Sequence, residues 1–298
     1  MEQGDHDMDN KITPKRTIIF CVITFVLTWA LVSVIPLTGM AYGASLESML
    51  IVSACMFMPT IGNVLTRLVT KQGFSDFKLA PRFKGNGKNY LLAYFSFIIL
   101  IYLGVVVYYL LYREQFTLSG GIMYQSVSTG ENLQVTQLII SIVTAAVISP
   151  VINLIPTLGE EIGWRGYLLY GLKNSCGSVK AVLFTGIIWG FWHAPMIAMG
   201  HNYGTAYSGY PVVGILLMVV FCVAIGIVES YLTLRTDSVL PAAICHSAVN
   251  GLAATGIGFI NTSEYNPLLG PTYAGIIPLI PTILFAGYLM YRIREEDL

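Results

Sequence analysis

Long apolar segments without charged side chains constrain this sequence more than any other feature. Residues 181–228 hold 48 consecutive positions without Asp, Glu, Lys or Arg, and the whole chain is 55% hydrophobic and only 11% charged. Ordinary soluble domains are roughly a quarter charged, and a helix needs about 20 apolar residues to cross a bilayer. The sequence therefore predicts an all-α, polytopic membrane protein with the lipid bilayer as a partner, and it points to no nucleic-acid partner.

Apolar windows along the chain predict about eight transmembrane helices. We expect one integral membrane domain over residues 1–298, with residues 1–15 as a disordered cytoplasmic tail. The first window has 21 uncharged residues, which exceeds the roughly 7–15 of a signal-peptide core and favours an anchor. The predicted helices cover residues 17–37, 48–66, 89–112, 134–157, 181–200, 211–233, 238–259 and 271–291.

The basic residues are distributed asymmetrically about these helices. If the chain crosses the membrane eight times, 15 of its 16 Lys and Arg residues fall on one side, and Arg113 alone falls on the other. Cytoplasmic loops carry such an excess of Lys and Arg. We therefore predict a multi-pass protein of the cell membrane, expected to be a bacterial plasma membrane, with both termini cytoplasmic.

Two adjacent carboxylates follow the fourth predicted helix, in the segment Gly-Glu-Glu-Ile-Gly-Trp-Arg that holds Glu160, Glu161 and Arg165. Neighbouring helical residues point about 100° apart, whereas residues four apart share a face. Glu161 can therefore pair with Arg165, which leaves Glu160 free to face a cavity. Ionisable groups at bilayer depth are costly and typical of functional sites, although a salt bridge at a helix end is a structural alternative.

Two further polar pairs lie in apolar surroundings downstream. Trp189 and His193 are four residues apart, and so are His246 and Asn250. A core histidine and interhelical hydrogen bonds are the structural alternatives. The functional interpretation of His246 and Asn250 is a pair of donors to a developing oxyanion.

Glu-Glu-x-x-x-Arg, aromatic-x-x-x-His and His-x-x-x-Asn, in this order on three apolar segments, resemble the CPBP family. These are the CAAX-protease and bacteriocin-processing (Abi) intramembrane proteins, which include the type II CAAX prenyl endopeptidases. The resemblance covers about residues 150–251. The chain departs from the usual pattern at Trp189 and Trp164, where the family has or often has Phe.

The resemblance implies a glutamate-dependent endopeptidase acting on a membrane-associated peptide or protein. Glu160 would activate a water with help from His193, while His246 and Asn250 would stabilise the oxyanion. Glu161, Arg165 and Trp189 would support them, and no cofactor or metal is expected. A catalytic zinc held by three ligands, Glu160, His193 and His246, is the weaker alternative, because no His-Glu-x-x-His motif is present.

Helix lengths place the three segments at different depths. At 1.5 Å per residue, His193 lies roughly 20 Å from the cytoplasmic end of its helix, and His246 roughly 12 Å from the cytoplasmic end of its own. We expect a cavity that opens to the cytoplasm and has its floor in the membrane. A non-catalytic immunity or scaffold protein and a small-solute transporter are alternatives, although a transporter often has inverted repeats, which are not evident here.

Overall fold

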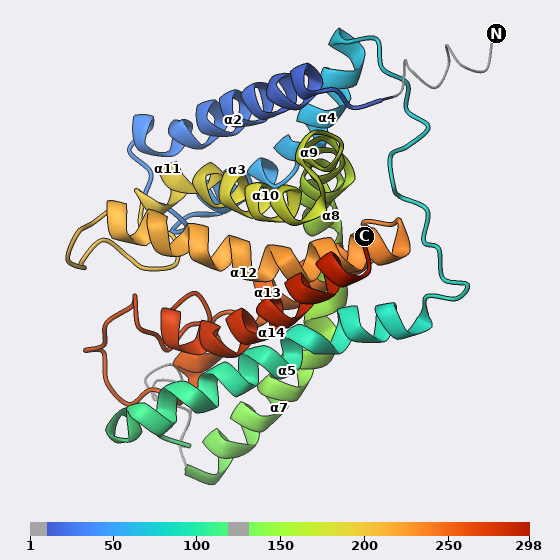
Figure 1. The fold of residues 1–298 in the computed structure, drawn as a ribbon. Coiled ribbons are helices and arrows are strands. Elements are labelled where there is room, and N and C mark those ends of the chain that lie inside the picture. The colour runs from blue at the N-terminus through green and yellow to red at the C-terminus, as the bar shows by residue number, and fades with distance from the viewer. Residues whose placement is uncertain (1–10, 119–130) are drawn as a thin grey trace, which may run out of the picture.

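The computed structural model describes residues 11–118 and 131–298 as a bundle of helices (Figure 1). The first ten residues of the predicted tail lie outside the described residues. The elements are α2 (Pro14–Leu37), α3 (Leu46–Cys55), α4 (Met58–Val69), α5 (Gly87–Leu111), η1 (Arg113–Gln115), α7 (Glu131–Ile152), α8 (Leu154–Gly163), η2 (Trp164–Leu168), α9 (Leu169–Cys176), α10 (Ser178–Trp192), α11 (Ala194–Ile197), α12 (Val212–Thr236), α13 (Leu240–Leu252), η3 (Thr255–Phe259) and α14 (Ile276–Glu295).

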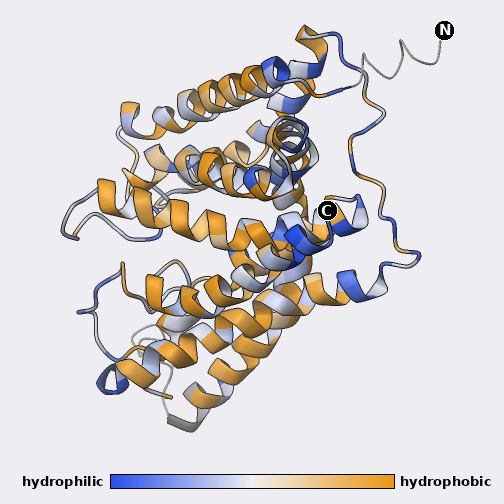
Figure 2. Cartoon of the chain, viewed as in Figure 1, coloured by the Kyte–Doolittle hydropathy of each residue, from blue (hydrophilic) through white to orange (hydrophobic). Residues whose placement is uncertain are grey.

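The all-α, polytopic architecture is confirmed. Apolar residues run along the helices, and hydrophilic residues gather at helix ends, including the end of α14 beside the C mark (Figure 2). Among the described residues, β pairing is limited to one isolated antiparallel bridge, between Phe116 and Ile260. Within residues 11–118 and 131–298, six helices are long and apolar enough to span a membrane, or seven if the bent pair α3–α4 is one span. The remaining predicted span corresponds to α10, which has only 15 residues.

Prolines divide three of the predicted spans. Pro59, Pro156 and Pro195 each follow a break, at Met56–Phe57, at Asn153 and at His193 respectively. Proline cannot donate the helical hydrogen bond to the carbonyl four residues earlier. The α3 and α4 axes consequently differ by 42°. Irregular backbone at membrane depth is tolerated where it is buried in protein or lines a cavity, so these breaks mark the interior of the bundle.

Packing places α12 and α13 at the centre of the bundle. The helix α12 packs against α10, α13 and α14, and α13 also packs against α5, α7 and α8. On the outer side, α2 packs against α4 and α9. The segment from Trp164 to Leu169 has almost no exposed surface, so the chain that follows the two glutamates is buried in the bundle.

One end of the bundle holds both ends of the described chain, and we call it the terminal end. There the Arg16 guanidinium donates to Thr70 O at 3.0 Å, and Asn174 donates to Ile12 O at 3.3 Å. Ser178 Oγ donates to the carbonyl of Leu298. These contacts join the first helix, the 70–86 loop, the start of α10 and the last residue. The two chain ends therefore lie on the same side of the bundle (Figure 1).

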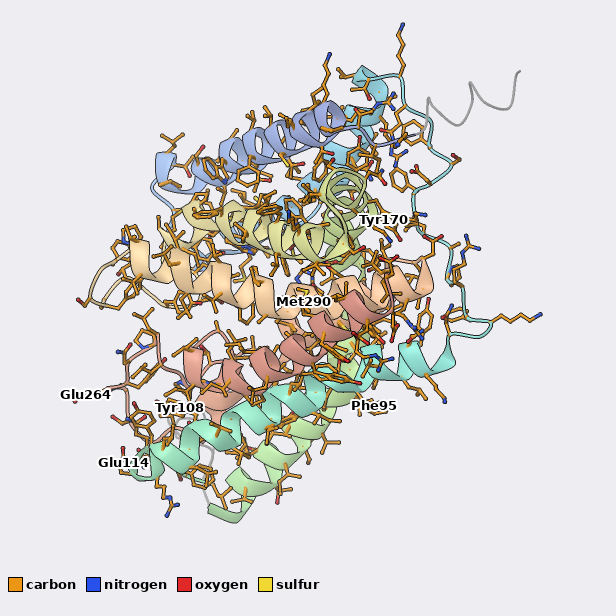
Figure 3. The ribbon with its side chains drawn as sticks, viewed as in Figure 1. Phe95, Tyr108, Glu114, Tyr170, Glu264 and Met290 are labelled. Atoms are coloured by element: carbon orange, nitrogen blue, oxygen red, sulfur yellow. The ribbon has the colours of Figure 1, made fainter. Side chains whose placement is uncertain are left out.

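The opposite end, which we call the loop end, is joined by its own contacts. Tyr42 OH lies 3.0 Å from His201 Nδ1, and Tyr203 OH donates to Ala274 O at 3.1 Å. The two loops that carry Glu114 and Glu264 also lie at this end, away from Tyr170 (Figure 3). Each long helix therefore runs from one end of the bundle to the other.

The two ends generate a topological prediction. Because the sequence predicts a cytoplasmic terminal end, cysteines replacing Leu118 and Glu264 should react with a membrane-impermeant maleimide in intact cells. Cysteines replacing Lys84 and Glu295 should react only after permeabilisation. Site-resolved mass spectrometry of the labelled protein measures both. Labelling of Lys84→Cys but not Leu118→Cys in intact cells would reverse the orientation.

Candidate active site

The two glutamates of α8 are oriented by the helix that packs on them. A Cβ built at Gly163 would lie 2.4 Å from Pro59 Cβ, so only glycine allows α8 and α4 to approach this closely. Asn63 of α4 donates to Ile162 O at 3.1 Å. At this point α8 passes directly into η2, and α4 adds this side-chain bond at the junction. The contact fixes the rotation of α8 and hence the directions of both carboxylates.

Arg165 is fully buried between two carboxylates. Its Nη1 lies 2.9 Å from Glu161 Oε1, which confirms the pairing expected from the sequence, and its Nη2 lies 2.5 Å from Glu229 Oε2. A Cβ at Gly226 would lie 2.8 Å from Nη2, so this glycine leaves room for the guanidinium. Arg165 thus joins the turn after α8 to the middle of α12.

Glu161 also holds His246 of α13. Its Oε1 lies 2.9 Å from His246 Nδ1. With the inner nitrogen engaged in this way, the other nitrogen of the ring, Nε2, is left for the cavity that His246 lines. Glu161 is therefore a positioning group for both Arg165 and His246.

Glu160 faces away from this ion cluster and is held by indoles. Trp189 Nε1 donates to Glu160 Oε2 at 2.8 Å, and Trp164 Nε1 lies 3.4 Å from the same oxygen. The Trp189 ring also lies 4.3 Å beneath the Arg165 guanidinium. Trp189 therefore links the buried arginine to the carboxylate that faces the cavity.

His193 lies where Pro195 ends α10. Its Nδ1 is 2.9 Å from Trp189 O, and its ring packs edge-on against Trp192 with centroids 4.7 Å apart. The backbone contact is the one expected of a core histidine, yet the residue also lines the cavity. The ring is fixed through Nδ1, which leaves Nε2 available to a bound molecule.

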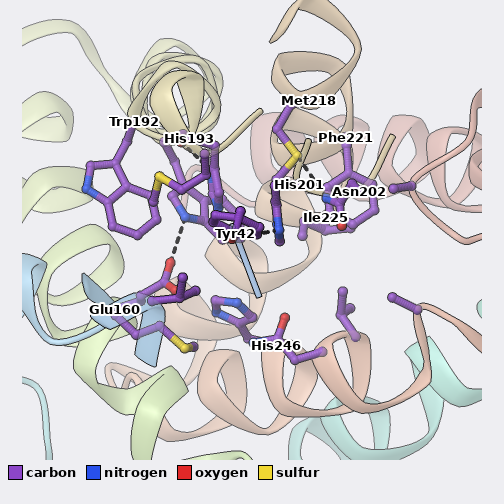
Figure 4. Close-up of a pocket in the computed structure, with 18 residues that line it drawn as sticks. Tyr42, Glu160, Trp192, His193, His201, Asn202, Met218, Phe221, Ile225 and His246 are labelled. Carbon is purple, nitrogen blue, oxygen red and sulfur yellow. Dashed lines mark hydrogen bonds between the residues drawn. The ribbon is translucent and has the colours of Figure 1, made fainter. Parts of the chain in front are cut away.

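A cavity of about 230 Å³ brings together Glu160, His193, His246 and Asn250 (Figure 4). These four residues come from the three segments that the sequence analysis selected, and Trp189 also lines the cavity. Glu161 and Arg165 lie behind its wall, fully buried. Thus the structure places all seven predicted site residues in or directly behind one cavity.

Two residues of this region escaped the sequence analysis. Glu229 lies inside the predicted helix 211–233, and a lone carboxylate at that depth is the same signal that selected Glu160. His201 lies in the 198–211 loop, outside the three segments that the sequence analysis selected. Its ring lies parallel to that of His193, at an interplanar angle of 7° and with centroids 6.2 Å apart.

The cavity extends toward the loop end. Its lining includes Tyr42, His201 and Ala274, which belong to that end of the bundle. The chain ends lie at the other end of the bundle. The sequence analysis expected cytoplasmic termini together with a cavity that opens to the cytoplasm, which would place the chain ends and the cavity opening at the same end. The physical reason is the break at His193. The short helix α10 ends at this histidine, and the chain that follows brings the 198–211 loop over the site.

A group of possible metal ligands differs from the one considered from the sequence. Ligand atoms of Glu161, Glu229 and His246 all lie within 4.8 Å of one another. However, Arg165 contacts both carboxylates of this group. The guanidinium already supplies the positive charge that a cation would bring, so these donors fit an arginine better than a metal.

Known proteins are similar to the segment that carries these residues. Residues 136–252 match the family model described as "Type II CAAX prenyl endopeptidase Rce1-like". A protein named CAAX prenyl protease 2, from Methanococcus maripaludis, is 29% identical over 92 residues. That match covers 30% of this chain and 34% of the relative, so it spans about a third of the relative's length. The family match contains all the predicted site residues, so the segment that carries the site is similar to the type II CAAX prenyl endopeptidase Rce1-like family.

Proposed function

We propose that the protein is an intramembrane endopeptidase that hydrolyses peptide bonds of a membrane-associated substrate with a water activated by Glu160. The observation that carries this proposal is the convergence of Glu160, His193, His246 and Asn250 on one cavity. Because the cavity lies inside a polytopic bundle, we expect its substrate to lie at or in the membrane. We also propose cytoplasmic termini and a location in the cell membrane.

In the proposed reaction, Glu160 takes a proton from a water that His193 helps to hold. The water oxygen bonds to the carbonyl carbon of the substrate, and the electron pair of the carbonyl moves to its oxygen. The carbon–nitrogen bond then breaks, and Glu160 passes its proton to the leaving amine. A positioned carboxylate that serves as base and then acid contributes about 10²–10⁴-fold in such reactions.

His246 and Asn250 are proposed to stabilise the oxyanion. Both line the cavity, and they are one helical turn apart on α13. An imidazolium at His246 has one N–H for Glu161 and a second for the oxyanion. Glu161 holds the ring in place before the substrate binds, and donors fixed in advance stabilise a transition state most effectively.

The role of Glu160 can be tested through its carboxamide variant. Glu160→Gln keeps the size and the indole contacts of the side chain but removes the base, so we expect turnover to fall by about 10²–10⁴-fold with no loss of folded protein. Quantitative proteomics of membranes from cells expressing each variant should reveal an uncut precursor. Glu264→Gln, which changes an exposed carboxylate at the loop end, is the matched control. Normal processing by Glu160→Gln would remove the proposed mechanism.

The oxyanion pair predicts an effect on rate rather than on binding. Asn250→Ala should lower kcat by about 10²–10³-fold, the scale of losing one oxyanion donor, with little change in KM. The assay uses the precursor identified above and purified protein, together with its unfolding temperature. Asn266→Ala, at an exposed asparagine in the loop before α14, is the control. If Asn250 serves only in interhelical hydrogen bonding, the unfolding temperature falls instead and the specific activity is unchanged.

We propose a reaction that needs no metal. Arg165 forms ion pairs with Glu161 and Glu229, so Glu160 is the carboxylate that can activate the water. Treatment with EDTA or 1,10-phenanthroline should therefore leave more than half of the activity of the purified protein. Metal analysis of the same sample gives the second readout. Stoichiometric zinc, with activity lost on its removal and restored on its return, would replace this account with a zinc mechanism through Glu160, His193 and His246.

A further inference from the structure

Nearly all basic residues lie at the terminal end. Of the 15 that the sequence places on that side, Arg67 and Arg165 are fully buried, which leaves 13 in the loops, the helix ends and the N-terminal segment there. Arg113 at the loop end is the single counterpart. Removing the two buried arginines from the count leaves the asymmetry intact. By the positive-inside rule, the loop end faces away from the cytoplasm.

The route from the terminal end to Glu160 is filled. Trp164, Arg165, Tyr167 and Leu168 have no exposed surface. Phe20 of α2 packs on two of these rings, with centroids 5.8 Å from Trp164 and 5.1 Å from Tyr167. A peptide arriving from the cytoplasm would have to displace this core and the buried Arg165 ion pairs. Separating a buried ion pair is strongly destabilising, because it leaves a buried charge without its partner.

The route from the loop end is lined by side chains that suit a peptide. Tyr42, His201 and Asn202 line the cavity on that side, and each is only half-buried. Among the described lining residues, Glu160 is the only one with a carboxylate, and none is Lys or Arg. Neutral polar groups can hydrogen-bond to a peptide backbone, and the methionines of the wall, including Met56 and Met218, adapt to apolar side chains.

We propose that this site receives its peptide from the extracytoplasmic side of the membrane. Its substrate class is then a translocated or secreted peptide, or the extracytoplasmic juxtamembrane segment of a membrane protein, rather than a tail in the cytoplasm. The identification as a substrate rests on the proposed peptidase function. The direction of access rests separately on the cavity lining and on the distribution of basic residues.

The test measures the side from which the cavity can be reached. Asn202→Cys is treated with a charged, membrane-impermeant methanethiosulfonate in intact cells and in inside-out vesicles, and the modified peptide is quantified by site-resolved mass spectrometry. We expect at least tenfold faster modification in intact cells than in inside-out vesicles. Lys84→Cys, at the terminal end, should show the opposite ratio. Val52→Cys, on another wall of the same cavity, gives an independent readout if Asn202→Cys fails to fold.

Three outcomes would overturn the proposal. These are modification of the cavity cysteines only in inside-out vesicles, equal modification from both sides, and no modification from either side in folded protein. The result is separable from the peptidase proposal, because labelling requires no turnover. If the cavity cysteines are modified in intact cells and Glu160→Gln still processes the precursor, the access route stands and the peptidase proposal is rejected. If they are modified only in inside-out vesicles and Glu160→Gln no longer processes the precursor, the peptidase proposal stands and the access route is rejected.

Discussion

The structure depends on one buried guanidinium. Arg165 has no exposed surface, and its two ends contact Glu161 and Glu229. A charge in a low-dielectric interior is tolerated only when it is paired, and removing one partner of such a pair costs about 3–5 kcal/mol. The pairing therefore holds together η2, α8 and α12, and through His246 it also orients α13. Because Glu161 is committed to this cluster, Glu160 is the carboxylate that remains for the cavity.

Broken helices make the cavity possible. A bundle of straight apolar helices would fill its centre with side chains, as protein interiors are closely packed. Here three prolines interrupt helices next to the site. The break before Pro59 brings Met56 to the cavity wall, the break before Pro156 starts the short helix of Glu160, and Pro195 ends α10 at His193. The same breaks let chain from the loop end lie over the site.

The helical architecture and most of the site could be predicted from the sequence. Apolar windows located the helices, and the spacing of four residues in Glu161–Arg165 predicted their ion pair. The direction of the cavity could not be predicted in this way, because depth was counted along uninterrupted helices and the break at His193 changes where the following chain goes. His201 was missed because its proximity to His193 arises from packing between loops. Glu229 could have been found by the argument used for Glu160, since it too is an isolated carboxylate in an apolar helix.

The unequal roles of the two neighbouring glutamates can be measured directly. Purified Glu160→Gln and Glu161→Gln are compared by unfolding temperature in detergent. Glu161→Gln removes a partner from both Arg165 and His246, so its unfolding temperature should fall by several degrees. Glu160→Gln keeps an oxygen that accepts the indole hydrogen bonds and breaks no ion pair, so no buried polar group loses its partner and the unfolding temperature should stay close to that of the unmodified protein. Equal destabilisation by both substitutions, or a larger loss for Glu160→Gln, would contradict the division of roles on which the account depends.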